Sequence, residues 1–346
     1  MTTDTAPRPA HHGSPVHEPP AAIRATGIVV VLAVAIAIVA LAFALPAANT
    51  APHHVPIGAA GPQAASGQVA AIMDKQAPGA FALTYYPGEE ALREAIRNRD
   101  VYGGIAFGPE GRTLLIATGG SPMVAQILTQ IGNGIAQQTG AQLRVEDLAP
   151  PTADDPRGAG LAASALPITL AGLLPAVALI FVLRREIWTR LTAVVAFSGV
   201  AGLTIAGLLR WVLGSIDANF WGVSGALALG VLATGLTLLG LGSLFGRVGL
   251  ALGAATALLI GNPLSGLTSA PELLPSGWGE FGQWLPQGAG ATLLRSAAFF
   301  DGAGATVPVL VLTCWVALGA ALVVLAALGR RRAESDVAGR AAPATA

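Results

Sequence analysis

Six apolar segments with almost no charged residues dominate this chain and restrict what it can fold into. A helix that crosses a lipid bilayer needs about 20 consecutive, mostly apolar residues. The first segment spans residues 27–45, and the other five come after residue 160. Those five cover residues 161–183, 191–213, 223–245, 248–260 with an extension, and 307–328. The pattern predicts an α-helical integral membrane protein with six transmembrane helices, arranged as one plus five.

The scarcity of charge supports this class of protein. Only 11% of the 346 residues are charged and 53% are hydrophobic, whereas an average soluble domain has about 25% charged residues. Such a chain cannot cover a water-soluble surface of this size, which excludes an ordinary cytosolic globular enzyme and a disordered protein. The 19 basic and 19 acidic residues cancel, so no net field attracts nucleic acid. We therefore expect the lipid bilayer as a partner and no nucleic acid.

The arginines that flank the apolar segments indicate the orientation. If six spans alternate, one side of the membrane receives Arg8, Arg24, Arg184, Arg185, Arg190, Arg247, Arg330, Arg331 and Arg332. The positive-inside rule makes that side cytoplasmic, so we expect a multi-pass protein of a bacterial cell membrane with both termini inside. A cleaved signal peptide is the alternative for the first segment. Signal-peptide cores are about 7–15 residues long, and this longer segment favours an uncleaved anchor.

These signals divide the chain into domains. Residues 1–26 are expected to form a disordered cytoplasmic tail, and residues 330–346 a second cytoplasmic tail. Between the tails we expect a first transmembrane helix over residues 27–47, an extracytoplasmic α/β domain with its linker over residues 48–160, and a five-helix membrane domain over residues 161–329.

The expected α/β domain has alternating strand and helix signals. Strands are predicted over residues 55–61, 81–86, 101–107, 113–118 and 142–145. A helix is predicted over residues 88–100, and a second one after Ser121, whose side chain can cap a helix that has Pro122 at its first position. Between two of the strands, Gly108-Pro109-Glu110-Gly111 is typical of a hairpin turn. The unit is large enough to fold alone.

Residues 261–306 differ from the other apolar parts of the membrane domain. Proline and glycine interrupt this stretch, which also contains Trp278 and Trp284. These features are typical of short helices that lie at the membrane interface or dip into it, with tryptophan at the depth of the headgroups. A plain extracellular loop is the alternative. We favour the re-entrant or interfacial arrangement, because so many apolar residues would otherwise face water.

Six polar side chains of the membrane domain are candidates for a gate or for contact with a substrate: Arg210, Asp217, Asn262, Glu272, Glu280 and Arg295. Arg210 lies within an apolar segment, where a long side chain can extend to the interface, and Asp217 is close enough to pair with it. The acidic residues can form an outer gate with Arg295, or simply be solvated at the outer face. Asn262, followed by Pro263, ends the fifth segment.

Motifs for chemistry are absent from the sequence. It contains no GxxxxGK[ST] motif for binding ATP through a P-loop, and no GxSxG or HExxH. Intramembrane acids and histidines that would couple transport to protons are almost absent. The single cysteine, Cys314, cannot form an intrachain disulfide. We therefore expect no enzyme activity, no catalytic or metal-binding residues and no cofactor.

The layout resembles the phage infection protein (Pip/YhgE-like) family, which is related to permeases of type-2 ABC exporters. The resemblance depends on the stretch from Ala95 to Ala106 in the outer domain and on a set of residues before the last span. That set consists of Asn262-Pro263, Pro271, Leu274-Pro275, Trp278, Trp284-Leu285-Pro286, Arg295 and Phe299-Phe300.

The resemblance implies a permease-like membrane protein that exports a lipophilic or envelope compound and is energised by a separate ATPase subunit. It also implies a homodimer. This chain departs from the exporters because the loop from Arg184 to Arg190 is very short for a helix that couples to an ATPase. The alternative function is a non-transporting envelope receptor, or a scaffold of secretion machinery, whose outer domain binds a partner.

Overall fold

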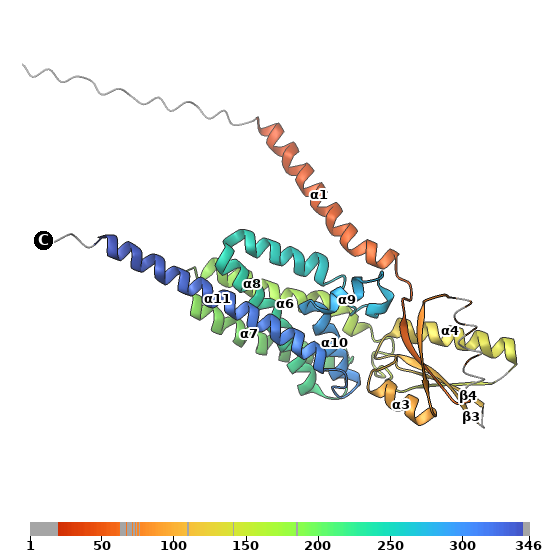
Figure 1. Ribbon diagram of the computed structural model, residues 1–346. Coiled ribbons are helices and arrows are strands. Elements are labelled where there is room, and N and C mark those ends of the chain that lie inside the picture. The colour runs from red at the N-terminus through yellow and green to blue at the C-terminus, as the bar shows by residue number, and fades with distance from the viewer. Residues whose placement is uncertain are drawn as a thin grey trace, which may run out of the picture. The chain divides into compact units, whose positions relative to one another are not determined.

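The structure is a computed structural model that describes residues 20–341, apart from residues 63–66, 68–70, 72, 74, 76, 109, 110, 141 and 185. Most of the described chain is helical, and a small sheet domain follows the first helix (Figure 1). Most of the predicted N-terminal tail, residues 1–19, lies outside the described residues.

Two helices extend beyond the boundaries that the sequence analysis gave them. Helix α1 spans Ala21–Ala48, so residues 21–26 belong to the first helix and not to a disordered tail. Helix α11 spans Thr306–Ala341, so most of the predicted C-terminal tail is also helical. Both extensions are rich in alanine and arginine, which favour helices and let an apolar helix continue past its last apolar turn.

Among the described residues, five helical stretches are long and apolar enough to cross a membrane. They comprise α1, the pair α5 (Ala159–Ala163) and α6 (Ala165–Val182), α7 (Ile187–Gly207) with η1 (Leu208–Val212), α8 (Phe220–Thr256) with η2 (Ala257–Gly261), and α11. In α1 none of the most apolar 18-residue window is buried. Such a surface is stable only in an apolar environment, which agrees with a multi-pass membrane protein.

The fourth stretch contains two of the six predicted spans. Gly246 interrupts α8 with a φ of 65° and a ψ of −146°, which are not helical. A Cβ atom on Gly253 would lie 2.8 Å from a side-chain carbon of Leu238, although 15 residues of straight helix would separate them by about 22 Å. The chain therefore reverses at Gly246, between the predicted segments 223–245 and 248–260. The count of six membrane crossings stays a prediction.

Helix α8 is the centre of the helical domain and packs against α6, α7, α10 (Pro286–Phe299) and α11. The segment predicted to be re-entrant, residues 261–306, contains the 3₁₀ turn η3 (Pro271–Leu273), α9 (Trp278–Gln283) and α10. Helix α10 is largely buried, and its Leu293, Leu294 and Ala297 belong to a hydrophobic core shared with α8 and α11. The depth of this segment in a membrane stays a prediction.

The sheet domain contains five described strands: β1 (Val55–Ala60), β2 (Phe81–Tyr86), β3 (Gly103–Gly108), β4 (Gly111–Ile116) and β5 (Leu143–Asp147). Their order in the sheet is β2-β1-β3-β4-β5, and only β3 and β4 are antiparallel neighbours. All five predicted strands are thus confirmed to within two residues at each end.

Two helices cover opposite faces of this sheet (Figure 1). Helix α3 (Glu89–Arg97) buries Leu92, Ala95 and Ile96 against Ala60, Ala106 and Leu115. Helix α4 (Pro122–Thr139) buries Val124, Ala125, Leu128 and Ile135 against Ile57, Ile105 and Leu114. Neighbouring residues of a strand alternate between the two cores because side chains of a strand point to opposite faces. Ser121 caps α4 and Pro122 begins it, as predicted.

Asp155 joins the sheet-domain linker to the start of the helical domain. Its carboxylate accepts hydrogen bonds from the backbone N–H groups of Ala159 at 2.9 Å and Gly160 at 2.8 Å, and from the Ser215 hydroxyl at 2.7 Å. Burial alone would raise the pKa of this carboxyl, but the three hydrogen bonds outweigh burial and hold the pKa below its ordinary value of 3.8.

We expect the Asp155→Ala variant to lose about 1 kcal/mol of stability at neutral pH, because α5 loses its cap and Ser215 its acceptor. A carboxyl with a lowered folded-state pKa stabilises above its ordinary pKa, and this stabilisation disappears as the pH falls through the folded-state pKa. The thermal midpoints of wild type and variant should therefore differ more at pH 7 than at pH 3. An equal difference at both pH values would contradict this role.

Candidate functional site

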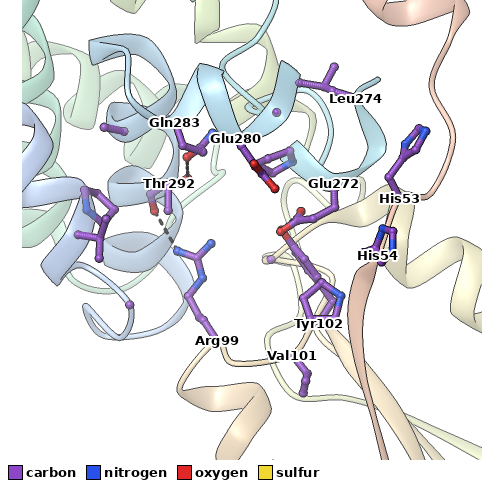
Figure 2. Close-up of a pocket in the computed structure, with 18 of the residues that line it drawn as sticks. His53, His54, Arg99, Val101, Tyr102, Glu272, Leu274, Glu280, Gln283 and Thr292 are labelled. Atoms are coloured by element: carbon purple, nitrogen blue, oxygen red, sulfur yellow. Dashed lines mark hydrogen bonds between the residues drawn. The ribbon is translucent and has the colours of Figure 1, made fainter. Parts of the chain in front are cut away.

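A cavity of about 490 Å³ lies where the sheet domain meets the segment before α11. The sheet domain contributes residues from the loop before β1, from the end of α3 and from the turn after β4. The helical domain contributes η3, α9, α10 and the start of α11. Figure 2 shows Arg99, Tyr102, His53 and His54 on one side of the cavity, and Glu272, Glu280, Gln283 and Thr292 on the other.

Main-chain hydrogen bonds build one wall of this cavity. The N–H of Ala51 donates to the carbonyl of Leu273 at 3.0 Å, and the N–H of His53 donates to the carbonyl of Glu272 at 2.8 Å. His54 then takes a left-handed conformation with a φ of 52° before β1 begins. These contacts place both histidines at the cavity, although Nδ1 of His53 is buried without a hydrogen-bond partner among the described residues.

Arg99 is the basic residue of the cavity wall. It follows α3 with a φ of 65°, which turns its side chain toward α10. Its Nη1 donates to the carbonyl of Thr292 at 3.0 Å and to the hydroxyl of Ser296, and its guanidinium lies 5.2 Å from the centroid of the Phe300 ring. Within the described parts of the chain, its Nε and Nη2 donate no hydrogen bond. Burial lowers the pKa of Arg99, although Tyr102 and Glu272 oppose this shift.

Tyr102 and Glu272 form a second polar contact across the cavity. The phenol of Tyr102 donates to Oε2 of Glu272 at 2.8 Å. Burial and the neighbouring Glu272 carboxylate raise the pKa of Tyr102 far above its ordinary value. The phenol therefore stays protonated and remains a hydrogen-bond donor to the carboxylate at any physiological pH.

Arg295 of α10 lies behind the cavity and binds the sheet domain. Only 7% of the residue is exposed, and its Nη1 donates to the carbonyl of Gly119 at 3.0 Å while Nη2 donates to the carbonyl of Leu267 at 2.6 Å. No ion pair of Arg295 occurs among the residues the structure places. Arg99 and Arg295 thus join the sheet domain to α10 in both directions, each through main-chain carbonyls of the other part.

The structure separates the six predicted site residues into three groups. Glu272 and Glu280 line the cavity, and Arg295 lies behind it without an ion pair to either of them among the described residues, so a gate of paired charges stays a prediction. Asn262 lies in a different, small cavity of about 30 Å³, where the Thr169 hydroxyl is 3.4 Å from its Oδ1. Arg210 does reach Asp217, but it donates to the main-chain carbonyl and not to the carboxylate.

Sequence analysis did not identify Arg99, Tyr102 and His53 as site residues. Arg99 and Tyr102 belong to the stretch from Ala95 to Ala106 that carried the family resemblance, but nothing in their spacing distinguishes Arg99 from the exposed Arg97. Only the fold shows that Arg99 faces α10 at a distance of 193 residues in sequence. In the described part of the chain, no group of three or more His, Cys, Asp and Glu residues could hold a metal ion.

Comparisons of the chain with models of protein families, with curated proteins and with solved structures found no match. The resemblance to the phage infection protein family stays a prediction, and so does the export that it implies.

The cavity has the chemistry of a site for an amphipathic molecule. Its apolar wall includes Ile96, Val101, Leu274, Val307 and Phe300. Its volume lies within the range of about 300–1,000 Å³ that is usual for small-molecule pockets. Arg99 offers unused donors to an acidic group, while Glu280, which is exposed, offers an acceptor to a basic or hydroxyl group.

Proposed function

We propose that this chain is a permease-like membrane protein of the type-2 ABC exporter kind. It exports a lipophilic or envelope compound, and a separate ATPase supplies the energy. The proposal places the sheet domain outside the cytoplasm and the cavity at the outer end of the helical domain, where it receives the compound. The cargo is amphipathic, with an acidic group that binds Arg99.

The observation that carries this proposal is the position and lining of the cavity. It lies between a folded domain and the helices, and each side contributes both polar and apolar residues. The main-chain contacts of Arg99 and Arg295 connect the sheet domain to α10, and α10 packs on α8 and α11. A movement of these helices would therefore change the cavity, as a transport cycle requires.

Co-purification is the test of the energy source. The full chain is purified from its own host in mild detergent, and the proteins that accompany it are identified by mass spectrometry. We expect an ATPase in stoichiometric amount. Envelope or secretion proteins without any ATPase, at every salt concentration, would overturn the exporter and support a receptor or scaffold.

A matched pair of arginine variants tests the role of the cavity. In Arg99→Met the cavity loses its unused donors, whereas Arg97→Met removes a side chain that is 60% exposed at the end of the preceding helix α3. Mass spectrometry compares the lipids and metabolites in the medium of a deletion strain and of complemented strains. We expect Arg97→Met to restore any compound that the deletion strain fails to export, and Arg99→Met to restore it at least about tenfold less well, as expected when one charge-assisted hydrogen bond is lost.

A second pair of variants separates loss of binding from loss of folding, because Arg99 also makes structural contacts. Val307 and Leu310 lie in the first turns of α11 and are exposed to 65% and 60%, but only Val307 lines the cavity. Val307→Trp should narrow the cavity and reduce export, whereas Leu310→Trp should not. Full export by both Arg99→Met and Val307→Trp would rule out the cavity as the binding site.

A further inference from the structure

Four arginines from different elements gather around the C-terminal end of α6, and none of them lines the cavity. Arg184 follows α6, and its Nε donates to the carbonyl of Phe181 at 3.3 Å. Nη1 of Arg330, in α11, donates to the carbonyl of Arg184 at 2.9 Å. The guanidinium of Arg247, just after the reversal in α8, lies 5.8 Å from the centroid of the Phe181 ring. We name Arg184, Arg190, Arg247 and Arg330 the arginine cluster.

Arg190 is the buried member of the cluster. Only 2% of this residue is exposed, its Nε donates to the carbonyl of Leu183, and its Nη1 lies 3.4 Å from the Ser243 hydroxyl. The charged group that acts on it electrostatically is Arg330, a like charge. All acceptors of the four guanidinium groups are neutral, and the ion pairs found among the described residues involve only Arg93, Arg97 and Arg144. Glu186, between Arg184 and Arg190 in sequence, is exposed and forms no ion pair with the cluster, so none of the four arginines is paired with an acidic side chain of the described residues.

The position of the cluster indicates which anion pairs with these arginines. One apolar stretch ends at Val182, the next begins at Ile187, and a third ends at Arg332, so the cluster lies where three candidate spans end. Large apolar side chains beside the arginines are exposed: Phe181, Val182, Phe245 and Val248. Trp188, half exposed, is of the residue type that favours the headgroup region. A free anion would use only the arginines, whereas a phospholipid would cover the arginines and the apolar side chains together.

We propose that the arginine cluster binds the phosphate headgroup of an anionic phospholipid, whose acyl chains cover Phe181, Val182, Phe245 and Val248. Arg184, Arg247 and Arg330 are exposed and can donate to the phosphate oxygens. The buried Arg190 contributes its positive charge from inside the protein. The lipid would hold together the ends of α6, α7 and α11 and the reversal in α8. This site rests on insertion of the helices into a membrane, but it does not depend on transport.

Native mass spectrometry of the full chain tests this site. The detergent-solubilised protein is titrated with dioleoyl phosphatidylglycerol or with dioleoyl phosphatidylcholine, and the bound lipid is counted. We expect wild type to bind phosphatidylglycerol at least about tenfold more tightly, as expected for basic residues that each attract an anionic lipid surface. We expect the double variant Arg184→Gln/Arg330→Gln to lose this preference. Arg184→Lys/Arg330→Lys, which keeps the charge, should retain most of it.

The double variant Arg97→Gln/Arg144→Gln is the control, because it removes the same net charge from exposed positions of the sheet domain. It should bind phosphatidylglycerol like wild type. Equal binding of both lipids by wild type, or an unchanged preference in Arg184→Gln/Arg330→Gln, would overturn the proposal. Displacement of phosphatidylglycerol by an equal concentration of inorganic phosphate would also overturn it, in favour of a free-anion site.

Failure of membrane insertion is seen separately, because the protein would then leave the membrane fraction on carbonate extraction. Failure of the proposed export function would appear in the profile of compounds in the medium and in the co-purification, without any change in lipid preference.

A single variant, Arg247→Gln, tests the site if Arg184→Gln/Arg330→Gln unfolds, as judged by its thermal midpoint. Arg247 makes no described hydrogen bond and contacts the cluster only through the Phe181 ring, so its loss should leave the fold intact.

Discussion

The Arg295→Met variant is expected to lose about 3 kcal/mol of stability, because two main-chain carbonyls inside the protein lose their donor at once. The guanidinium of Arg295 binds Gly119 in the sheet domain and Leu267 in the segment after η2, and methionine keeps most of the volume without any donor. The thermal midpoint of the detergent-purified protein, followed by tryptophan fluorescence, should fall by roughly 5 °C. Cleavage of the linker over residues 149–158 by a protease should become faster.

Arg295→Lys and Arg97→Met serve as controls for this result. Lysine provides a single ammonium that cannot bridge two carbonyls in the planar geometry of a guanidinium, so its effect should lie between wild type and methionine. Arg97→Met should leave the midpoint unchanged, since the Arg97 side chain is exposed and its ion pair with Glu90 is 3.8 Å long. An Arg295→Met protein as stable as Arg97→Met would show that the sheet domain does not depend on this contact.

The second large effect is expected at Gly319, where α11 crosses α8. A Cβ atom at this position would lie 2.5 Å from the carbonyl carbon of Leu236 and 2.6 Å from the nitrogen of Thr237. Both are backbone atoms within a helix, so they cannot move aside as a flexible side chain can. The facing helix is equally close, since a Cβ atom on Gly240 would lie 2.7 Å from the carbonyl oxygen of Gly319.

Gly319→Ala should therefore cost about 3 kcal/mol, at the upper end for an overpacked core, because the two helices must separate. Gly329→Ala in the same helix is the matched control, since nothing lies within 4 Å of its Cβ position. Alanine favours a helix over glycine, so this control should be neutral or slightly stabilising. The two variants are compared by their thermal midpoints and by the fraction of monodisperse protein after gel filtration. Equal behaviour of the two variants would contradict the close crossing of α8 and α11.

Local signals explain why the elements of the sheet domain were predictable. Ser121 followed by Pro122 determines the start of α4, and the sequence Gly108-Pro109-Glu110-Gly111 predicts the hairpin in which β3 and β4 are antiparallel neighbours. Each of these depends on a few adjacent residues. The order of the strands does not, because β1 pairs with both β2 and β3 through backbone hydrogen bonds that any residue except proline can make.

The helix ends and the reversal at Gly246 were less predictable. The charge of Arg24 suggests a tail outside the first helix, but one arginine among alanines does not stop a helix. Gly246 is one of 44 glycines in the chain. Its left-handed conformation is allowed to any glycine, and only the packing of Gly253 against Leu238 shows that the chain turns back there.

The candidate site depended even more on distant contacts. Glu272 and Glu280 were selected as acidic residues of an otherwise apolar stretch, and both line the cavity. Arg210 was selected as a basic residue within an apolar segment and Asn262 as the end of one, and the fold places these two elsewhere. Arg99 was not found, because its role comes from Thr292 and Ser296, nearly 200 residues away.

The sequence by itself determined the apolar segments, the class of membrane protein that they indicate, and the helices and strands of the sheet domain. These follow from periodicity, capping residues and turn residues, which act over a few positions of the chain. Only the tertiary structure decided which polar groups meet. Both the cavity beside Arg99 and the arginine cluster involve side chains that bind main-chain carbonyls of distant elements. A carbonyl carries no sequence signal, because every residue has one.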